Sequence, residues 1–158
     1  MTIAANLAKF LEHRRTHYDL VRHAPTDSSL QSARAAHVPP EQIAKGVLLD
    51  DGEHLLLTVV PASCHVQLGD LREQLGRPVR LAEEQRIREV FEDCVPGAIP
   101  AIGPAYGLET IIDERLVEQS EIYFEAGDRE HLLHMQGGDF VALLRGCKSG
   151  RFCSPIQQ

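Results

Sequence analysis

Two mostly apolar runs separated by a short polar turn constrain the fold of this chain more than any other feature. They span residues 44–49 and 54–60 and flank the turn sequence Asp50-Asp51-Gly52. Aspartate followed by glycine between such runs is typical of a β-hairpin, because glycine reaches backbone angles that other residues avoid. The sequence therefore predicts a hairpin with buried strands, against which the rest of the chain packs.

Helical and extended patterns alternate along the remainder of the chain. Apolar spacing and capping residues predict helices over residues 3–15, 29–37, 67–76, 82–91, 114–119 and 137–146. Short β-forming runs predict strands over residues 18–23, 78–81, 108–113, 121–126 and 131–135. This order predicts a mixed α/β (α+β) fold. We expect a single compact domain over residues 1–158, with a mixed sheet of six or seven strands surrounded by helices.

Composition excludes several functional classes. The formal charge of −7 argues against a surface that coats DNA, although it permits contact with one end of a nucleic acid. No apolar run approaches the roughly 18 residues that a membrane span requires. The first residues lack the pattern of a signal peptide, so we expect a cytoplasmic protein with reduced cysteines. We expect no cofactor, no DNA partner and no membrane partner.

Lys45 is unusual because it lies at the start of a predicted buried strand. The chain has 16 lysine and arginine residues, but only three are lysines, so arginine is its ordinary cation. A compact ammonium at this position indicates a need for a point charge that an arginine would not meet. The neighbouring Gly46 leaves room for another group to approach. The alternative is a lysine that extends to solvent from the end of a strand.

The segment from residue 94 to residue 107 predicts an apolar loop. Its glycines and prolines are too frequent for a helix or a central strand. Between Gly97 and Gly103 they hold the backbone in a defined shape, and exposed amides of such a loop can bind an oxyanion or a carbonyl. The alternative is a packed connection with no binding role.

Other chemical sites receive weaker support from the sequence. His131 and His134 could combine with Cys147 and Cys153 in a zinc site, but the spacing fits no common zinc pattern. Histidines three apart on a strand also point to opposite faces. No nucleophile-elbow motif is present. We therefore expect no metal site.

Four motifs together resemble the YbaK and prolyl-tRNA-synthetase-associated domain family, which contains trans-editing aminoacyl-tRNA deacylases. They are TDSSLQSA from residue 26, IAKGVLL from residue 43, GAIPAIG from residue 97 and IYFEAGDREHLLHM from residue 122. Their order and spacing along nearly the whole chain also match. The resemblance implies a compact mixed sheet with a central pocket.

The resemblance also implies roles for individual residues. In the family, the lysine that Lys45 matches is essential, and the loop glycine that Gly97 matches positions the aminoacyl carbonyl through backbone amides. His131 matches a substrate-pocket position in the synthetase-insertion relatives. Relatives with G-x-x-x-P differ, because here Pro100 follows Gly97 one residue sooner, as in a G-A-x-P branch. The implied substrate-binding residues are Ser29, Gly46, Gly97, Ala98, Ile99, Pro100, Gly103 and His131.

The resemblance implies hydrolysis of the ester of a mischarged aminoacyl-tRNA, with Lys45 as an electrostatic catalytic residue. The expected partner is the acceptor 3′ end of an aminoacyl-tRNA, and an aminoacyl-tRNA synthetase is a second candidate. The residues alone leave two other functions open. The chain could bind aminoacyl-tRNA or a synthetase without hydrolysis, or it could hydrolyse another small ester or amide.

Overall fold

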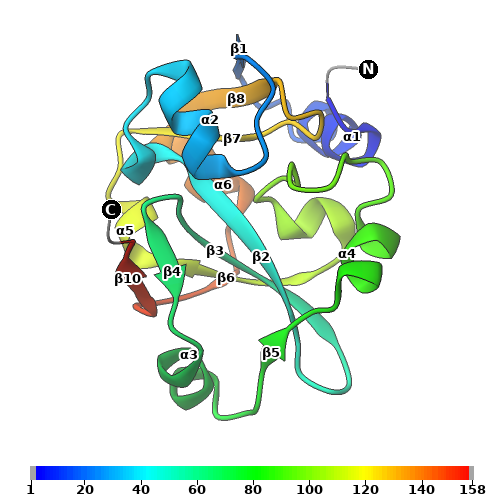
Figure 1. The fold of residues 1–158 in the computed structure, drawn as a ribbon, viewed down its shortest axis with the longest axis vertical. Helices are drawn as coiled ribbons and strands as arrows, with labels where there is room; N and C mark the ends of the chain where they lie inside the picture. The colour runs from blue at the N-terminus through cyan, green and yellow to red at the C-terminus, as the bar shows by residue number, and fades with distance from the viewer. Residues whose placement is uncertain (1–2, 157–158) are drawn as a thin grey trace.

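The predicted hairpin forms the centre of the fold. The computed structural model describes residues 3–156, and in it β2 (Ala44–Asp50) pairs antiparallel with β3 (Leu55–Pro61). Figure 1 shows the two strands running side by side through the middle of the molecule. The turn is closed by Asp51, whose carboxylate accepts hydrogen bonds from the amides of Glu53 and His54. This local bonding explains why the polar turn sequence separates the two apolar runs.

The hairpin belongs to a five-stranded sheet with the order β5-β2-β3-β6-β9. Its three other strands are β5 (Arg80–Leu81), β6 (Glu109–Asp113) and β9 (Lys148–Gly150). β3 pairs parallel with β6, and β6 pairs parallel with β9, whereas β5 pairs antiparallel with β2. The sheet is therefore mixed, and β2 and β3 lie inside it. This position accounts for the nearly continuous burial of β3.

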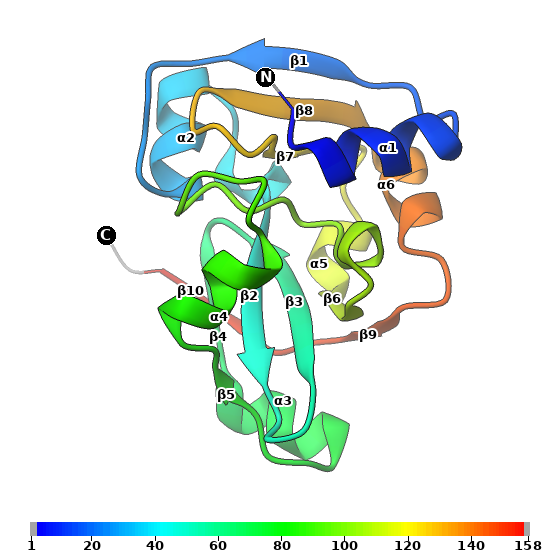
Figure 2. The ribbon, with the colours of Figure 1, turned by 90° about the vertical axis from the view of Figure 1, so that its right-hand side faces the viewer.

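Two smaller sheets complete the strand arrangement. The first has the order β1-β8-β7 and the second pairs β10 with β4. Their strands are β1 (Asp19–Arg22), β8 (His131–Gln136), β7 (Glu121–Glu125), β4 (Cys64–Val66) and β10 (Cys153–Pro155). Figure 2 shows the three-stranded sheet across one end of the hairpin, together with α1 and α2. A single bridge between Ile43 and Tyr123 joins it to the start of β2.

The helices are short and lie around these sheets. They are α1 (Ala5–His13), α2 (Ser29–Ala36), α3 (Leu68–Leu75), α4 (Glu84–Val90), α5 (Glu114–Val117), α6 (Gly137–Leu143) and the 3₁₀ turns η1 (Pro40–Gln42) and η2 (Gly103–Tyr106). Each corresponds to a segment where the sequence predicts a helix, a turn or a loop. Ser28 caps α2 by accepting from the amide of Gln31, and Gly76 ends α3 in the left-handed conformation. No helix within residues 3–156 is long and apolar enough to cross a bilayer.

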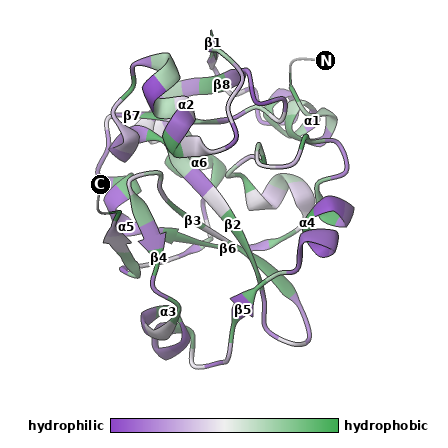
Figure 3. Ribbon diagram, in the orientation of Figure 1, coloured by the Kyte–Doolittle hydropathy of each residue, from purple (hydrophilic) through white to green (hydrophobic). Residues whose placement is uncertain are grey.

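The buried residues form a main cluster and two smaller clusters. The main cluster joins the inner face of the hairpin to α1, α6 and the three-stranded sheet, with Phe124 and Phe140 in tilted ring contact. In Figure 3 the apolar colour follows the central strands, whereas polar residues are frequent on α2 and α4. The hydrophobic pattern of the sequence thus matches the burial of the elements.

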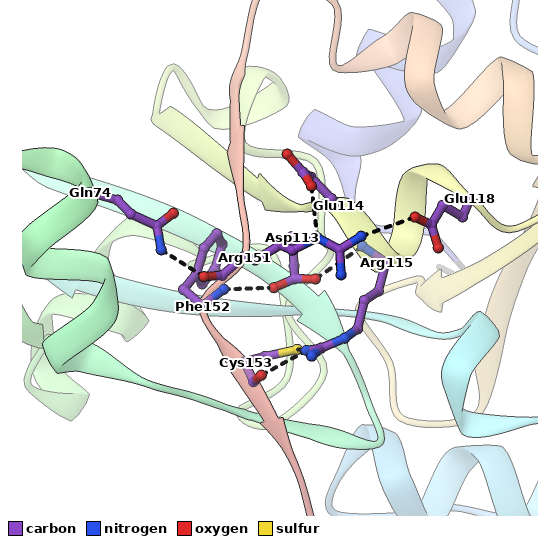
Figure 4. Close-up of polar contacts among 8 residues, drawn as sticks. All are labelled: Gln74, Asp113, Glu114, Arg115, Glu118, Arg151, Phe152 and Cys153. Atoms are coloured by element: carbon purple, nitrogen blue, oxygen red, sulfur yellow. Dashed lines mark hydrogen bonds and ion pairs between the residues drawn. The ribbon is translucent and has the colours of Figure 1, made fainter.

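A buried carboxylate attaches the C-terminal segment to the sheet. Asp113 is fully buried, and its two oxygens accept from the amides of Arg115 and Phe152, both at 3.0 Å. Arg115 in turn donates to the carbonyl of Cys153 at 2.7 Å. Figure 4 shows this network, with Arg151 reaching towards two glutamates at the surface. The network positions β10 beside β4.

The predicted mixed α/β class is confirmed, and the structure adds detail to the sheet. Within residues 3–156 ten strands lie in three sheets, whereas the sequence predicts one sheet of six or seven strands. The additional strands β4, β9 and β10 have three residues each. A segment this short carries no detectable alternation, so long-range pairing alone defines it as a strand.

Candidate functional site

A cavity of about 690 Å³ opens beside the first half of β2. Its wall is formed by the start of α2, by β2, by α4 with the turn that follows it, and by the loop from residue 94 to residue 99. Arg129, in the turn between β7 and β8, completes the wall. In Figure 2, α4 and the loop pass close to β2. The volume is within the range of pockets that bind small molecules or the end of a larger ligand.

Lys45 is one of the residues that line this cavity, and its side chain is half-buried. Its Nζ donates to the carbonyl of Cys64 at 2.7 Å, and within residues 3–156 it has no carboxylate partner. Burial lowers the pKa of Lys45 below its usual value. An ammonium has three protons, so the bond to Cys64 leaves two for a ligand. The bond to Cys64 fixes the charge in place.

Gly46 allows the loop to approach β2. A side-chain carbon at this position would lie 3.2 Å from the carbonyl oxygen of Pro100 and 3.3 Å from Leu57 Cδ1. The room that Gly46 provides is therefore occupied by the loop itself. This contact brings the loop against β2 at the residue that follows Lys45.

Two backbone amides of the loop have no backbone hydrogen-bond partner within residues 3–156. Gly97 has a φ of 87°, and a side chain there would approach the carbonyl oxygen of Asp27 to 2.9 Å. The amide of Ala98 is occupied by the carbonyl of Val95 at 3.1 Å. The amides of Gly97 and Ile99 donate to no backbone carbonyl within residues 3–156. Both residues line the cavity, so their amides are candidate donors for a ligand.

Arg129 fastens the loop to the rest of the wall. Its Nε donates to the carbonyl of Pro96 at 2.6 Å, and its Nη1 lies 3.5 Å from the Asp27 carboxylate. Arg129 has a positive φ of 68°, which is uncommon for a residue other than glycine. The guanidinium thus joins the loop to the segment before α2. Strained backbone of this kind is frequent at binding sites.

Five of the predicted site residues line the cavity together: Ser29, Lys45, Gly46, Gly97 and Ile99. The other four lie behind or beside the wall: Ala98, Pro100, Gly103 and His131. Ala98 and Pro100 are buried, and Gly103 packs directly against Thr110, which leaves no room for a side chain. Their positions are consistent with shaping the loop. His131 starts β8, and its ring bonds the Asp128 carboxylate at 2.6 Å.

The histidines and cysteines of the alternative zinc hypothesis have other partners. His134 bonds Glu121 at 2.8 Å and stacks on Tyr123. Cys147 lies against the main buried cluster, and Cys153 lies in a different one. Within residues 3–156 no group of three or more metal-ligating side chains could hold an ion.

Cys94, Cys147 and Cys153 are also poorly suited to act as nucleophiles. Burial raises the pKa of Cys94 and of Cys153 to about 12, and burial raises the pKa of Cys147 as well. Thiols with a raised pKa hold their proton at neutral pH, and the thiolate is the nucleophilic form.

Sequence reasoning missed the contribution of α4 and two ionisable residues. Ile87 of α4 and Phe91, which caps its C-terminal end, line the cavity, although their spacing is typical of a helix face that simply packs on the core. Arg129 and Glu125 lie in a motif that the resemblance identified, but nothing in their local pattern marks them. Glu125 is buried and receives a hydrogen bond from Ser29 Oγ at 3.4 Å.

The structure is a small α/β domain with one main cavity beside β2. Residues that line this cavity include the cation Lys45 and two loop residues whose amides have no backbone partner within residues 3–156. The family of aminoacyl-tRNA editing domains matches residues 23–143, which is most of the chain. The chain therefore belongs to the aminoacyl-tRNA editing domain family, and the resemblance inferred from the four motifs is confirmed. No protein with a curated description matches this sequence.

Several solved structures share the fold at low sequence identity. A candidate trans-editing enzyme for prolyl-tRNA synthetase matches with a TM-score of 0.81 and 23% identity over 96% of both chains. A hypothetical protein matches with a TM-score of 0.81 and 20% identity over 94% of this chain and 99% of its own. A candidate signal transduction protein from Marinobacter aquaeolei VT8 matches with a TM-score of 0.75 and 20% identity. That match covers 94% of this chain but 30% of the larger protein.

Proposed function

We propose that this chain is an aminoacyl-tRNA deacylase that hydrolyses the ester between a mischarged amino acid and the 3′ end of tRNA. The observation that carries the proposal is that Lys45, Gly97 and Ile99 line one cavity. The amides of the two loop residues have no backbone hydrogen-bond partner within residues 3–156. Family membership supports an editing role. The structural neighbour described as a candidate trans-editing enzyme is consistent with it.

The proposed mechanism needs few chemical groups because an aminoacyl ester is already activated. Water adds to the ester carbonyl, and the carbon–oxygen bond to the ribose then breaks. The amino acid leaves with its carboxylate, and the ribose oxygen takes a proton. The amides of Gly97 and Ile99 stabilise the negative oxygen of the tetrahedral intermediate. The adjacent ribose hydroxyl helps to activate the water, so the protein supplies position and charge.

Lys45 acts in this mechanism as a fixed positive charge. Its partial burial strengthens its attraction for the developing oxyanion or for the terminal phosphate, because little water screens it. The formal charge of −7 is compatible with a partner that touches the protein only at its acceptor end. The proposed partner is therefore the terminal aminoacyl-adenosine of tRNA, with the remainder of the tRNA outside the cavity.

Replacing Lys45 tests this function. Lys45→Ala should retain the fold and lower the rate of deacylation by about a hundredfold or more, as expected for loss of a transition-state charge. The measurement is release of amino acid from tRNAs charged with alanine, serine, cysteine or threonine, with protein present in substoichiometric amount. Lys148→Ala is the matched control, since Lys148 is an exposed lysine paired with Glu109.

The result separates the proposal from its alternatives. Wild-type turnover with a normal rate in Lys45→Ala would contradict the proposed mechanism. Binding of charged tRNA without turnover would instead support a non-catalytic binding module, and turnover of model esters alone would support a different hydrolase. We expect a chelator to leave the rate unchanged, and strong inhibition would favour the zinc hypothesis.

A further inference from the structure

Glu125 is a buried carboxyl group next to the cavity that the proposed mechanism does not use. It is the last residue of β7, and its side chain is 2% exposed. Its carboxyl group accepts a hydrogen bond from Ser29 Oγ at 3.4 Å. Ser29 in turn lines the cavity. Glu125 therefore contacts the cavity wall through one serine hydroxyl.

The polar groups near this carboxyl group are hydroxyls, and they do not neutralise its charge. Ser32 Oγ bonds Thr26 Oγ1 at 2.6 Å and also donates to the carbonyl of Ser28, so the start of α2 is held by its own hydrogen bonds. Within residues 3–156 Glu125 has no cationic partner. A carboxylate left in this position is costly unless a ligand provides the missing positive charge.

The ionisable groups on the adjacent elements do not change this conclusion. Asp128, in the turn after β7, is negative and is bonded to His131 of β8. Arg34 of α2 and Arg22 of β1 are exposed. His23 is buried after β1, where its Nδ1 bonds the carbonyl of Ala24. Burial raises the pKa of Glu125 to about 7, so the carboxyl group changes charge near neutral pH.

The charge of Glu125 determines what Ser29 offers to a ligand. An ionised carboxylate accepts hydrogen bonds only, so the Ser29 hydroxyl must donate to it. The lone pairs of Ser29 then remain available to accept from a cationic donor in the cavity. A protonated carboxyl group can donate, which frees the hydroxyl of Ser29 to donate to the cavity. When Glu125 is ionised, the Ser29 hydroxyl therefore serves as a hydrogen-bond acceptor for a ligand in the cavity.

We propose that Ser29 and Glu125 bind the free α-ammonium group of the aminoacyl ester, with Ser29 accepting its hydrogen bond and Glu125 supplying the opposite charge. The assignment rests on the proposed function, because it names the part of the substrate that this wall binds. Lys45 repels an ammonium and favours its placement at α2, with the ester carbonyl towards Lys45 and the loop. Ser29 contacts the substrate, and Glu125 is a positioning residue.

Binding of two non-hydrolysable analogues tests the proposal. They are adenosine with alanine amide-linked at its 3′ position, and the same compound with an N-acetyl group. At pH 7.5 wild-type protein should bind the free amine about tenfold more tightly, as expected for a hydrogen bond to a charged group. Glu125→Gln and Ser29→Ala should each remove most of this preference. Titration calorimetry measures both affinities, and Glu121→Gln on the same strand is the control.

The pH dependence distinguishes this role from a merely structural one. The preference of wild-type protein should fall from pH 7.5 to pH 6, although the ligand amine becomes more protonated, and in Glu125→Gln it should stay flat. Equal binding of both analogues, no binding of either, or an undiminished preference in both variants would overturn the proposal. Circular dichroism checks folding, and Ser29→Ala removes only a hydroxyl. Because binding needs no turnover, an absence of hydrolysis would contradict the proposed function separately.

Discussion

Lys45 lines the cavity and Glu125 lies behind Ser29 of its wall, and neither has an oppositely charged partner within residues 3–156. In the described part of the chain, the Lys45 ammonium bonds the carbonyl of Cys64, and the Glu125 carboxyl group bonds the hydroxyl of Ser29. Desolvation of an unpaired charge lowers the stability of the fold. Such groups are therefore found mainly where a ligand supplies the opposite charge. For Glu125 this cost should be measurable as a dependence of stability on pH.

The stability of the wild-type protein should fall as the pH rises from about 4.5 to about 7. The folded protein holds the Glu125 proton more tightly than the unfolded chain, because burial raises its pKa from 4.5 to about 7. Glu125→Gln cannot ionise, so at pH 8 it should be more stable than wild-type protein, by up to about 3 kcal/mol. Urea unfolding at pH 5 and pH 8 measures the difference.

The two proteins should have similar stabilities at pH 5, where Glu125 is protonated in the folded state. Glu121→Gln, at the exposed start of β7, should follow the wild-type curve above pH 6. A Glu125→Gln variant that is less stable than wild-type protein at pH 8 would show that the buried carboxylate is stabilised by contacts other than those described.

The hairpin and the loop between α4 and η2 depend on each other for the shape of the cavity. The carbonyl of Pro100 lies against Gly46 of β2, and Gly97 lies against the carbonyl of Asp27 before α2. Tyr106 further fastens the loop by bonding the Asp93 carboxylate at 3.0 Å. Each close approach requires a glycine, because a side chain would push the loop outwards.

Replacing Gly97 by alanine should cost stability and also reduce deacylation. A left-handed conformation costs alanine about 1–2 kcal/mol, and at Gly97 the new methyl group also collides with the Asp27 carbonyl. Gly146 is a matched control, because its φ of 88° is nearly the same and no atom lies within 4 Å of the added carbon. Gly146→Ala should lose only the roughly 1–2 kcal/mol of the left-handed backbone, less than Gly97→Ala, and keep its deacylation rate.

Urea unfolding and the deacylation assay measure the two effects separately. If Gly97→Ala and Gly146→Ala lost the same stability and both retained full deacylation, the loop would not need its observed position. That result would remove the loop amides from the proposed mechanism while leaving Lys45 in place.

At the scale of the whole molecule, the C-terminal segment supports the position of Lys45. Asp113 binds the amide of Phe152 and thereby holds β10 beside β4. β4 contains Cys64, whose carbonyl accepts from Lys45 Nζ. A buried network of hydrogen bonds therefore links one end of the chain to the cation in the cavity.

Asp113→Ala should destabilise the protein by about 3 kcal/mol, since it leaves a buried amide without its charged acceptor. Glu118→Ala is the control, because Glu118 forms an exposed ion pair with Arg151 and should change stability by less than about 1 kcal/mol. Urea unfolding measures both variants. A loss of stability no greater in Asp113→Ala than in Glu118→Ala would contradict this role of the network.

The sequence by itself was sufficient for the elements with a strong local signal. The hairpin follows from apolar runs around an Asp-Gly turn, α2 follows from its serine cap, and the end of α3 follows from Gly76. These features depend on residues a few positions apart, so local sequence contains the necessary information. The family also followed from four short motifs, and Lys45 was identified from the scarcity of lysine.

Only the tertiary structure decided which groups meet. The contact of Pro100 with Gly46, the bond from Lys45 to Cys64 and the bond from Ser29 to Glu125 join residues far apart in the chain. Three-residue strands such as β4 and β10 likewise exist only through their pairing. Such contacts depend on the packing of the whole chain, which local propensity and spacing do not determine. The sequence therefore identified Lys45 and the loop, whereas the fold placed them in one cavity beside Glu125.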